Sequence, residues 1–136
     1  MKIKLAKKET IHFIGIGGIG MSGLSLIMKG QGFKVQGSDI VDNKNIDRLR
    51  KEKIKIYLNQ TKKNLKNATI VVISSAIKKN NPELIEAKRR KIPIIKRGEM
   101  LASTVSLMKN IVVVGSHGKT TTTSLITSIF QKTKID

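Results

Sequence analysis

Three glycines near the start of the chain have the spacing of loops that bind diphosphates. Gly15, Gly17 and Gly20 fit the pattern G-x-G-x-x-G and follow the short apolar run 11–14. In this pattern the first glycine allows a tight turn, the second lets the backbone approach a pyrophosphate, and the third lets the next helix pack closely. The N-terminus of that helix then offers unpaired N–H groups to the anion. A glycine-rich turn with a purely structural role is the alternative interpretation.

A second glycine-rich turn, G-S-H-G-K-T-T, occupies residues 115–121 after an apolar run. Gly118, Lys119 and Thr120 form the central part of a P-loop. In such a loop backbone N–H groups surround phosphate, the lysine reaches the β- and γ-phosphates, and the hydroxyl holds Mg²⁺. The common spacing would place a glycine at position 113, where this chain has Val113. The sequence therefore predicts a shortened P-loop, in which His117 shapes the loop.

The elements that position these turns follow from hydrophobic periodicity. We expect strands at 11–14, 34–37, 55–58, 69–73 and 93–96, and helices at 20–31, 45–53, 83–90 and 97–107, with a loop or weak helix at 59–67. The residues expected to face the core from the first and third helices are Met21, Leu24, Ile27, Met28, Leu84, Ile85 and Ala87. This alternation predicts an α/β fold with a Rossmann-like parallel sheet and helices on both faces. The first strand, P-loop and helix of a second α/β domain would follow.

In an open parallel sheet, ligands bind beyond the carboxyl ends of the strands. Four polar or glycine-rich segments leave those ends, at 15–20, 38–39, 74–77 and 97–99. We therefore expect these four segments to converge on one cleft.

Three residues or pairs in these segments have two interpretations each. Asp39 stands where a dinucleotide fold places the acid that binds a ribose hydroxyl, but it could also cap a helix. Ser74 and Ser75 could donate to phosphate or sugar oxygens, or satisfy their own turn. Arg97 could bind an anion, or form an exposed pair with Glu99.

Composition limits the classes of function. The 136 residues include 27 basic and 9 acidic residues, a net charge of +18, with no cysteine and two histidines. A thiolate or histidine metal cluster is thereby excluded, and no apolar run approaches the roughly 20 residues of a membrane span. The charge suggests nucleic acid, but the lysines are spread along the chain and aromatic residues are few, which favours a solvated surface. We expect a cytoplasmic protein without specific nucleic-acid binding.

Several strings together resemble the Mur ligase family. They are G-I-G-G-I-G-M-S-G at 15–23, G-S-D at 37–39, S-S-A-I at 74–77, R-G-E-M-L-A at 97–102 and G-S-H-G-K-T-T-T-T at 115–123. The similarity runs in order over nearly the whole chain, and the short P-loop is the form found in this family. The M-S-G after the first turn favours the alanine-adding branch over the branch that recycles muropeptides.

The resemblance implies a step of peptidoglycan synthesis. Such enzymes use ATP to phosphorylate the carboxylate of UDP-N-acetylmuramate, and the amine of L-alanine then attacks the acyl phosphate. The residues it implies for the UDP-sugar are Gly15, Gly17, Gly18, Ile19, Gly20, Ser38, Asp39, Ser74, Ser75, Ala76 and Arg97. Those it implies for ATP are Gly115, Ser116, His117, Gly118, Lys119, Thr120 and Thr121, with Lys119 and Thr120 catalytic and Thr120 on Mg²⁺.

The same resemblance divides the chain into a UDP-sugar-binding domain at 1–108 and the start of a central ATP-binding domain at 109–136. Two other functions are compatible with parts of the sequence: a small NAD-binding module, which needs only the first turn and Asp39, and a basic nucleic-acid-binding protein.

Family members carry a complete ATPase domain and a further domain, so we expect the 136-residue chain alone to lack ligase activity. The measurement is phosphate release from ATP in the presence of UDP-N-acetylmuramate and L-alanine. Release that requires both substrates would contradict this expectation.

Overall fold

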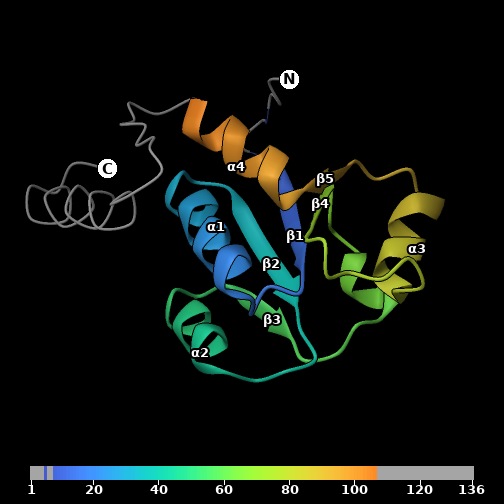
Figure 1. The fold of residues 1–136 in the computed structure, drawn as a ribbon, viewed down its shortest axis with the longest axis horizontal. Helices are drawn as coiled ribbons and strands as arrows, with labels where there is room; N and C mark the ends of the chain where they lie inside the picture. The colour runs from blue at the N-terminus through green and yellow to red at the C-terminus, as the bar shows by residue number, and fades with distance from the viewer. Residues whose placement is uncertain (1–4, 6–7, 107–136) are drawn as a thin grey trace, which may run out of the picture.

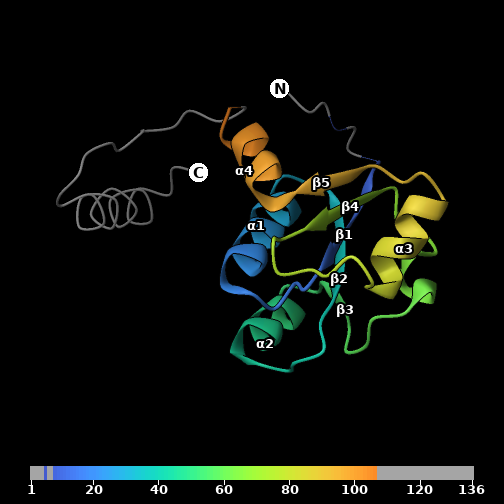
Figure 2. The same cartoon turned by 45° about the vertical axis from the view of Figure 1, so that its right-hand side comes forward.

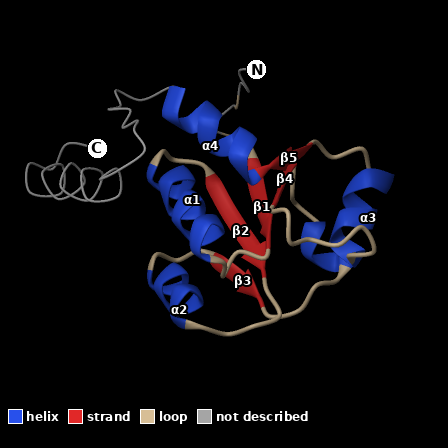
Figure 3. Ribbon diagram, viewed as in Figure 1, coloured by secondary structure: helices blue, strands red, loops and turns tan. Residues whose placement is uncertain are grey.

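The computed structural model describes residues 5 and 8–106, which form one parallel sheet covered by helices (Figure 1). The sheet has five strands in the order β3-β2-β1-β4-β5, all paired in parallel. The strands are β1 (Thr10–Ile14), β2 (Lys34–Ser38), β3 (Lys55–Tyr57), β4 (Ile70–Ile73) and β5 (Ile94–Lys96). The helices are α1 (Ile19–Gly30), α2 (Lys44–Lys51), the 3₁₀ helix η1 (Lys62–Leu65), α3 (Pro82–Arg89) and α4 (Arg97–Ser106). Figure 3 distinguishes helices from strands by colour.

The central strand β1 pairs with β2 on one side and β4 on the other. Ile11 lies opposite both Val35 and Ile70, and Phe13 lies opposite Gly37 and Val72. The strand order reverses direction at β1, since β2 and β3 lie on one side of it and β4 and β5 on the other. Such a reversal creates a crevice at the carboxyl ends of the strands, and the glycine-rich turn 15–18 leaves β1 at this point.

Each face of the sheet has its own apolar core. Helices α1, α2 and α4 cover one face, while α3 and η1 cover the other (Figure 2). The first face buries the apolar side chains Ile11, Phe13, Met21, Leu24, Met28, Ile46, Leu49 and Met100, among others. The second face buries Ile14, Leu65, Ala68, Val71, Leu84, Ala87 and Ile92. The expected α/β fold, with helices on both faces, is confirmed.

Within the described residues 8–106 the expected elements are all present, and their boundaries there differ from the predicted ones by two residues or fewer. The segment expected to be a loop or weak helix contains η1. Pro82 is the first residue of α3, where a missing N–H costs nothing, and Asn81 caps the helix by accepting from the N–H groups of Glu83 and Leu84.

Two residues expected in the core are exposed. Ile27 is 39% exposed and Ile85 is 52% exposed, so both predictions are wrong. In α1 the small polar residues Ser22 and Ser25 are buried. The buried face of α1 therefore includes these serines and excludes Ile27. In α3 the carboxylate residue Glu83 is fully buried on the side opposite Ile85. Both buried faces therefore include polar residues, which an apolar pattern does not detect.

The expected second domain cannot be compared with the structure. The boundary at 108–109 and the P-loop residues 115–121 lie outside the described residues. Within the part that is described, no helix is long and apolar enough to cross a membrane. That part also has no group of three or more His, Cys, Asp or Glu side chains able to hold a metal ion.

Close packing between β2 and the turn after β1 gives a test of the fold. A Cβ atom at Gly37 would lie 2.5 Å from Ile16 Cδ1 and 2.8 Å from the Phe13 carbonyl oxygen. We expect Gly37→Ala to lower the free energy of unfolding in urea by about 1–3 kcal/mol because neither neighbour can move freely. Gly23→Ala is the control, since a Cβ there meets nothing within 4 Å. Alanine should stabilise α1 at that position by up to about 1 kcal/mol, and equal effects of the two substitutions would contradict this account.

Candidate functional site

The N–H groups of the glycine-rich turn are hydrogen-bonded to other groups of the protein. Gly15, at φ +80°, and Ile16 both donate to the carbonyl oxygen of Ser38, at 2.8 and 2.9 Å. Gly17 donates to Asp39 Oδ2 at 2.8 Å, and Gly18 donates to the Gly15 carbonyl at 3.2 Å. The four turn N–H groups are therefore all hydrogen-bonded to the end of β2 or within the turn.

The first turn of α1 supplies the donors that the glycine-rich turn does not. Gly18 is the N-cap of α1 and provides no side-chain hydrogen bond. The first N–H groups of a helix have no partner within the helix. In the part of the chain that the structure describes, no acceptor lies on the N–H groups of Ile19, Gly20 and Met21, and Gly18, Ile19 and Gly20 are exposed. This helix end is available to an anion, and the α1 dipole favours one.

Arg97 brings a positive charge to the same place. Its guanidinium lies beside Gly20, because a Cβ atom at Gly20 would be only 2.6 Å from Arg97 Nη1. Gly20 thus allows the arginine at the start of α4 to lie against the start of α1. The alternative pair with Glu99 is absent, since no ion pair joins these two described side chains. The arrangement brings a cation and a helix N-terminus together.

A cleft of about 580 Å³ opens beside Arg97, at the carboxyl ends of β4 and β5. It is lined by Ile73, Ser74, Ser75, Ile77, Lys96, Arg97, Gly98 and Glu99. The Ala76 N–H donates to Ser74 Oγ at 3.3 Å. Ser74 therefore stabilises its own turn, which is the alternative role expected from the sequence. Ser75 and Ala76 are exposed. Ile77 reaches the glycine-rich turn, since its Cδ1 would be 3.3 Å from a Cβ at Gly15.

Asp39 supports the turn from the other side. Besides Gly17, its carboxylate accepts from the Val41 N–H at 3.1 Å, through Oδ1. Asp39 does not cap α2, because Asn43 is the cap residue and accepts from Ile46. A Cβ at Gly17 would lie 2.8 Å from Asp39 Oδ2 and 3.0 Å from Ile46 Cδ1. The second glycine of the pattern therefore makes room for side chains of this protein.

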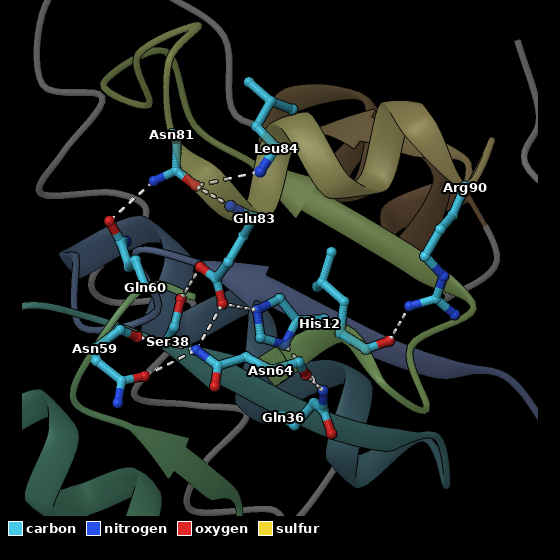
Figure 4. A network of polar contacts seen from close by, with 11 residues as sticks. His12, Gln36, Ser38, Asn59, Gln60, Asn64, Asn81, Glu83, Leu84 and Arg90 are labelled. Atoms are coloured by element: carbon cyan, nitrogen blue, oxygen red, sulfur yellow. Dashed lines mark hydrogen bonds and ion pairs between the residues drawn. The ribbon is translucent and has the colours of Figure 1, made fainter. Parts of the chain in front are cut away.

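Ser38, expected near the ligand, points into the core. Its side chain is fully buried, and Oγ donates to Glu83 Oε2 at 2.5 Å. Figure 4 shows this contact within a buried polar network. The structure therefore brings together segments 15–20, 74–77 and 97–99. In segment 38–39, Asp39 binds the turn through its carboxylate, whereas Ser38 binds it only through its carbonyl group. Sequence reasoning missed Glu83, whose signal was an acidic residue at the start of a helix together with polar residues at alternate positions of β1 and β2.

Comparison with known proteins agrees with this geometry. A model of the Mur ligase family, catalytic domain, matches residues 10–109. The chain belongs to the Mur ligase family. This Mur ligase chain is 74% identical over 136 residues to the UDP-N-acetylmuramate–L-alanine ligase of Pelagibacter ubique, and 61% identical over 122 residues to that of Rickettsia prowazekii. The alignments cover 100% and 90% of this chain but only 29% and 25% of those relatives.

Solved structures of family members have the same fold. The UDP-N-acetylmuramate-alanine ligase of Thermotoga maritima superposes with a TM-score of 0.81 at 33% identity, covering 92% of this chain and 30% of that one. A UDP-N-acetylmuramate:L-alanyl-gamma-D-glutamyl-meso-diaminopimelate ligase from Neisseria superposes with a TM-score of 0.77 at 30% identity. That alignment covers 91% of this chain and 40% of the Neisseria protein. Both branches of the family considered from the sequence thus share this domain.

The role of Asp39 as a support of the turn can be tested by unfolding. We expect Asp39→Ala to lower the free energy of unfolding by about 1–3 kcal/mol, since it leaves the Gly17 N–H without its acceptor. Asp42→Ala is the matched control, because among residues 8–106 the Asp42 side chain makes only an exposed ion pair with Arg50, which is worth about 0–1 kcal/mol. Urea denaturation of both variants decides the matter, and equal losses would show that the Gly17 bond is unimportant.

Proposed function

We propose that this chain supplies the UDP-N-acetylmuramate-binding part of an enzyme that joins L-alanine to that sugar nucleotide with ATP, in peptidoglycan synthesis. The names of its relatives support this substrate, although the chain spans less than a third of their length. The observation that carries the proposal is the Arg97 guanidinium lying against Gly20 at the N-terminus of α1. A nucleoside diphosphate-sugar has two phosphate groups for such a site.

The residues fall into three roles in this proposal. The N–H groups of Ile19 and Gly20, with Arg97, bind the pyrophosphate. Ser74 and Ser75 face the remainder of the UDP-sugar from the cleft, and Ala76 completes the turn that carries them. A supporting set consisting of Gly15, Gly17, Gly18, Ser38 and Asp39 holds the turn in place.

The ATP half of the proposal rests on residues 109–136. Here Gly115, Ser116, His117, Gly118 and Thr121 would surround the phosphates of ATP, Lys119 would stabilise charge on the transferred phosphoryl group, and Thr120 would bind Mg²⁺. These residues belong to the start of the central domain, and 1–108 to the UDP-sugar domain. Mg²⁺ would neutralise charge between the phosphates, and L-alanine would bind to parts of the enzyme outside this domain.

Calorimetric titration of the 136-residue chain with UDP-N-acetylmuramate, and separately with NAD, tests the proposed ligand. We expect saturable binding of the UDP-sugar and weaker or absent binding of NAD, since the Asp39 carboxylate already accepts from Gly17 and Val41. Tighter binding of NAD would overturn the proposal. Strongly salt-dependent binding to random-sequence duplex DNA, unaffected by the UDP-sugar, would favour a nucleic-acid-binding function instead.

Arg97 should account for much of the affinity. We expect Arg97→Gln to weaken binding of UDP-N-acetylmuramate by about 10- to 100-fold, because hydrogen bonds between charged groups contribute roughly 1.5–3 kcal/mol. Arg48→Gln removes the same charge from an exposed position of α2 and is the control. Its affinity should stay within about twofold of the original if the effect is local rather than due to net charge. Equal losses in the two variants would contradict the assignment of Arg97.

A further inference from the structure

A buried polar network lies under α3, on the opposite face of the sheet from α1 (Figure 4). Its centre is Glu83, whose carboxylate is fully buried. The carboxylate accepts from Ser38 Oγ at 2.5 Å, from Asn64 Nδ2 at 3.0 Å, and lies 2.9 Å from His12 Nε2. Three donors from β1, β2 and η1 therefore meet on one side chain of α3.

The hydrogen-bonding roles in this network are determined by its outer members. Gln36 Nε2 donates to the backbone carbonyl oxygen of Asn64 at 2.8 Å and lies 3.0 Å from His12 Nδ1. Since the side-chain amide of Gln36 is oriented by the Asn64 carbonyl, His12 Nδ1 accepts and His12 Nε2–H donates to Glu83. The donor and acceptor atoms of the network are thereby assigned, so it can hold the ends of the strands in one arrangement.

Ser38 connects this network to the glycine-rich turn. Its side chain donates to Glu83, while its carbonyl oxygen accepts from the N–H groups of both Gly15 and Ile16. It is also the last residue of β2, and the next residue, Asp39, accepts from Gly17. The position of the Ser38 peptide therefore determines where three consecutive N–H groups of the turn find their acceptors.

We propose that Glu83 is a positioning residue for the anion site: through Ser38 it holds the end of β2, and thereby the turn that orients the first N–H groups of α1. A buried charged network adds little to stability compared with apolar packing of the same volume. The network around Glu83 instead fixes the position of Ser38, the residue of β2 to which the turn is hydrogen-bonded. The affinity part of the proposal rests on the proposed function, whereas the ordering of the turn does not.

The test measures the turn directly, by amide hydrogen exchange of the 136-residue chain followed by NMR. The variants are Glu83→Ala, Ser38→Ala and the two combined. The control is Gln36→Met, which disturbs the same network at the next inward-facing position of β2 without removing the Ser38–Glu83 bond. Exchange of the Gly15 and Ile16 amides is expressed relative to Val71 and Val72 in β4, so that a general loss of stability cancels.

We expect the relative protection of Gly15 and Ile16 to fall about tenfold in Glu83→Ala and in Ser38→Ala, because one hydrogen bond to a charged group is lost in each. The combined variant should show no larger fall than Ser38→Ala, since the two substitutions remove the same bond. Gln36→Met should leave the ratio unchanged. If Glu83→Ala does not fold, Ser38→Ala still decides. Unchanged relative protection in Ser38→Ala, or an equal fall in Gln36→Met, would overturn the proposal.

Titration of the same variants with UDP-N-acetylmuramate distinguishes this proposal from the proposed function. We expect Ser38→Ala to bind about tenfold more weakly than Gln36→Met. Failure of the unsubstituted chain to bind the UDP-sugar would contradict the proposed function, and the exchange measurements would still decide the role of Glu83. Binding by Ser38→Ala as tight as by Gln36→Met, with the turn loosened, would contradict the role of Glu83 in affinity.

Discussion

The site depends on how one carbonyl group is shared. The Ser38 carbonyl oxygen accepts from both Gly15 and Ile16, and the adjacent Asp39 carboxylate accepts from Gly17. A buried or partly buried N–H group without an acceptor costs about 1–3 kcal/mol, so the end of β2 determines the path of the chain between β1 and α1. The direction of α1, and the exposure of its first N–H groups, follow from that path.

The two faces of the sheet are coupled at this point. Phe13 and Gly37 pack toward α1, and Gly37 leaves room for Ile16. Alternate positions of the same strands, His12 and Ser38, lie on the other face and bind Glu83. The alternation of side chains along a strand thus connects an apolar core under α1 with a polar network under α3. This connection is the structural basis for the proposal that α3, which forms no part of the proposed anion site, influences that site.

Hydrophobic periodicity was sufficient to predict the strands, the helices and the edge where the polar segments meet, because burial of apolar side chains dominates those features. It was insufficient where polar side chains take core positions. Glu83 in α3 is buried because donors distant in sequence satisfy its carboxylate. In α1, Ser22 and Ser25 are buried while Ile27 is partly exposed. Such partners are paired only in three dimensions, so the apolar pattern could predict neither the burial of Glu83 nor the inward direction of Ser38.

The geometry also explains why G-x-G-x-x-G alone does not identify a ligand. All four turn N–H groups, from Gly15 to Gly18, are satisfied within the protein, and the space beside Gly17 is filled by Asp39 and Ile46. The turn therefore supplies a helix N-terminus that any diphosphate could use. Discrimination between diphosphates must come from groups that converge on that helix end from other strands. In this chain the candidate groups are Arg97, beside Gly20, and the residues lining the cleft at the carboxyl ends of β4 and β5.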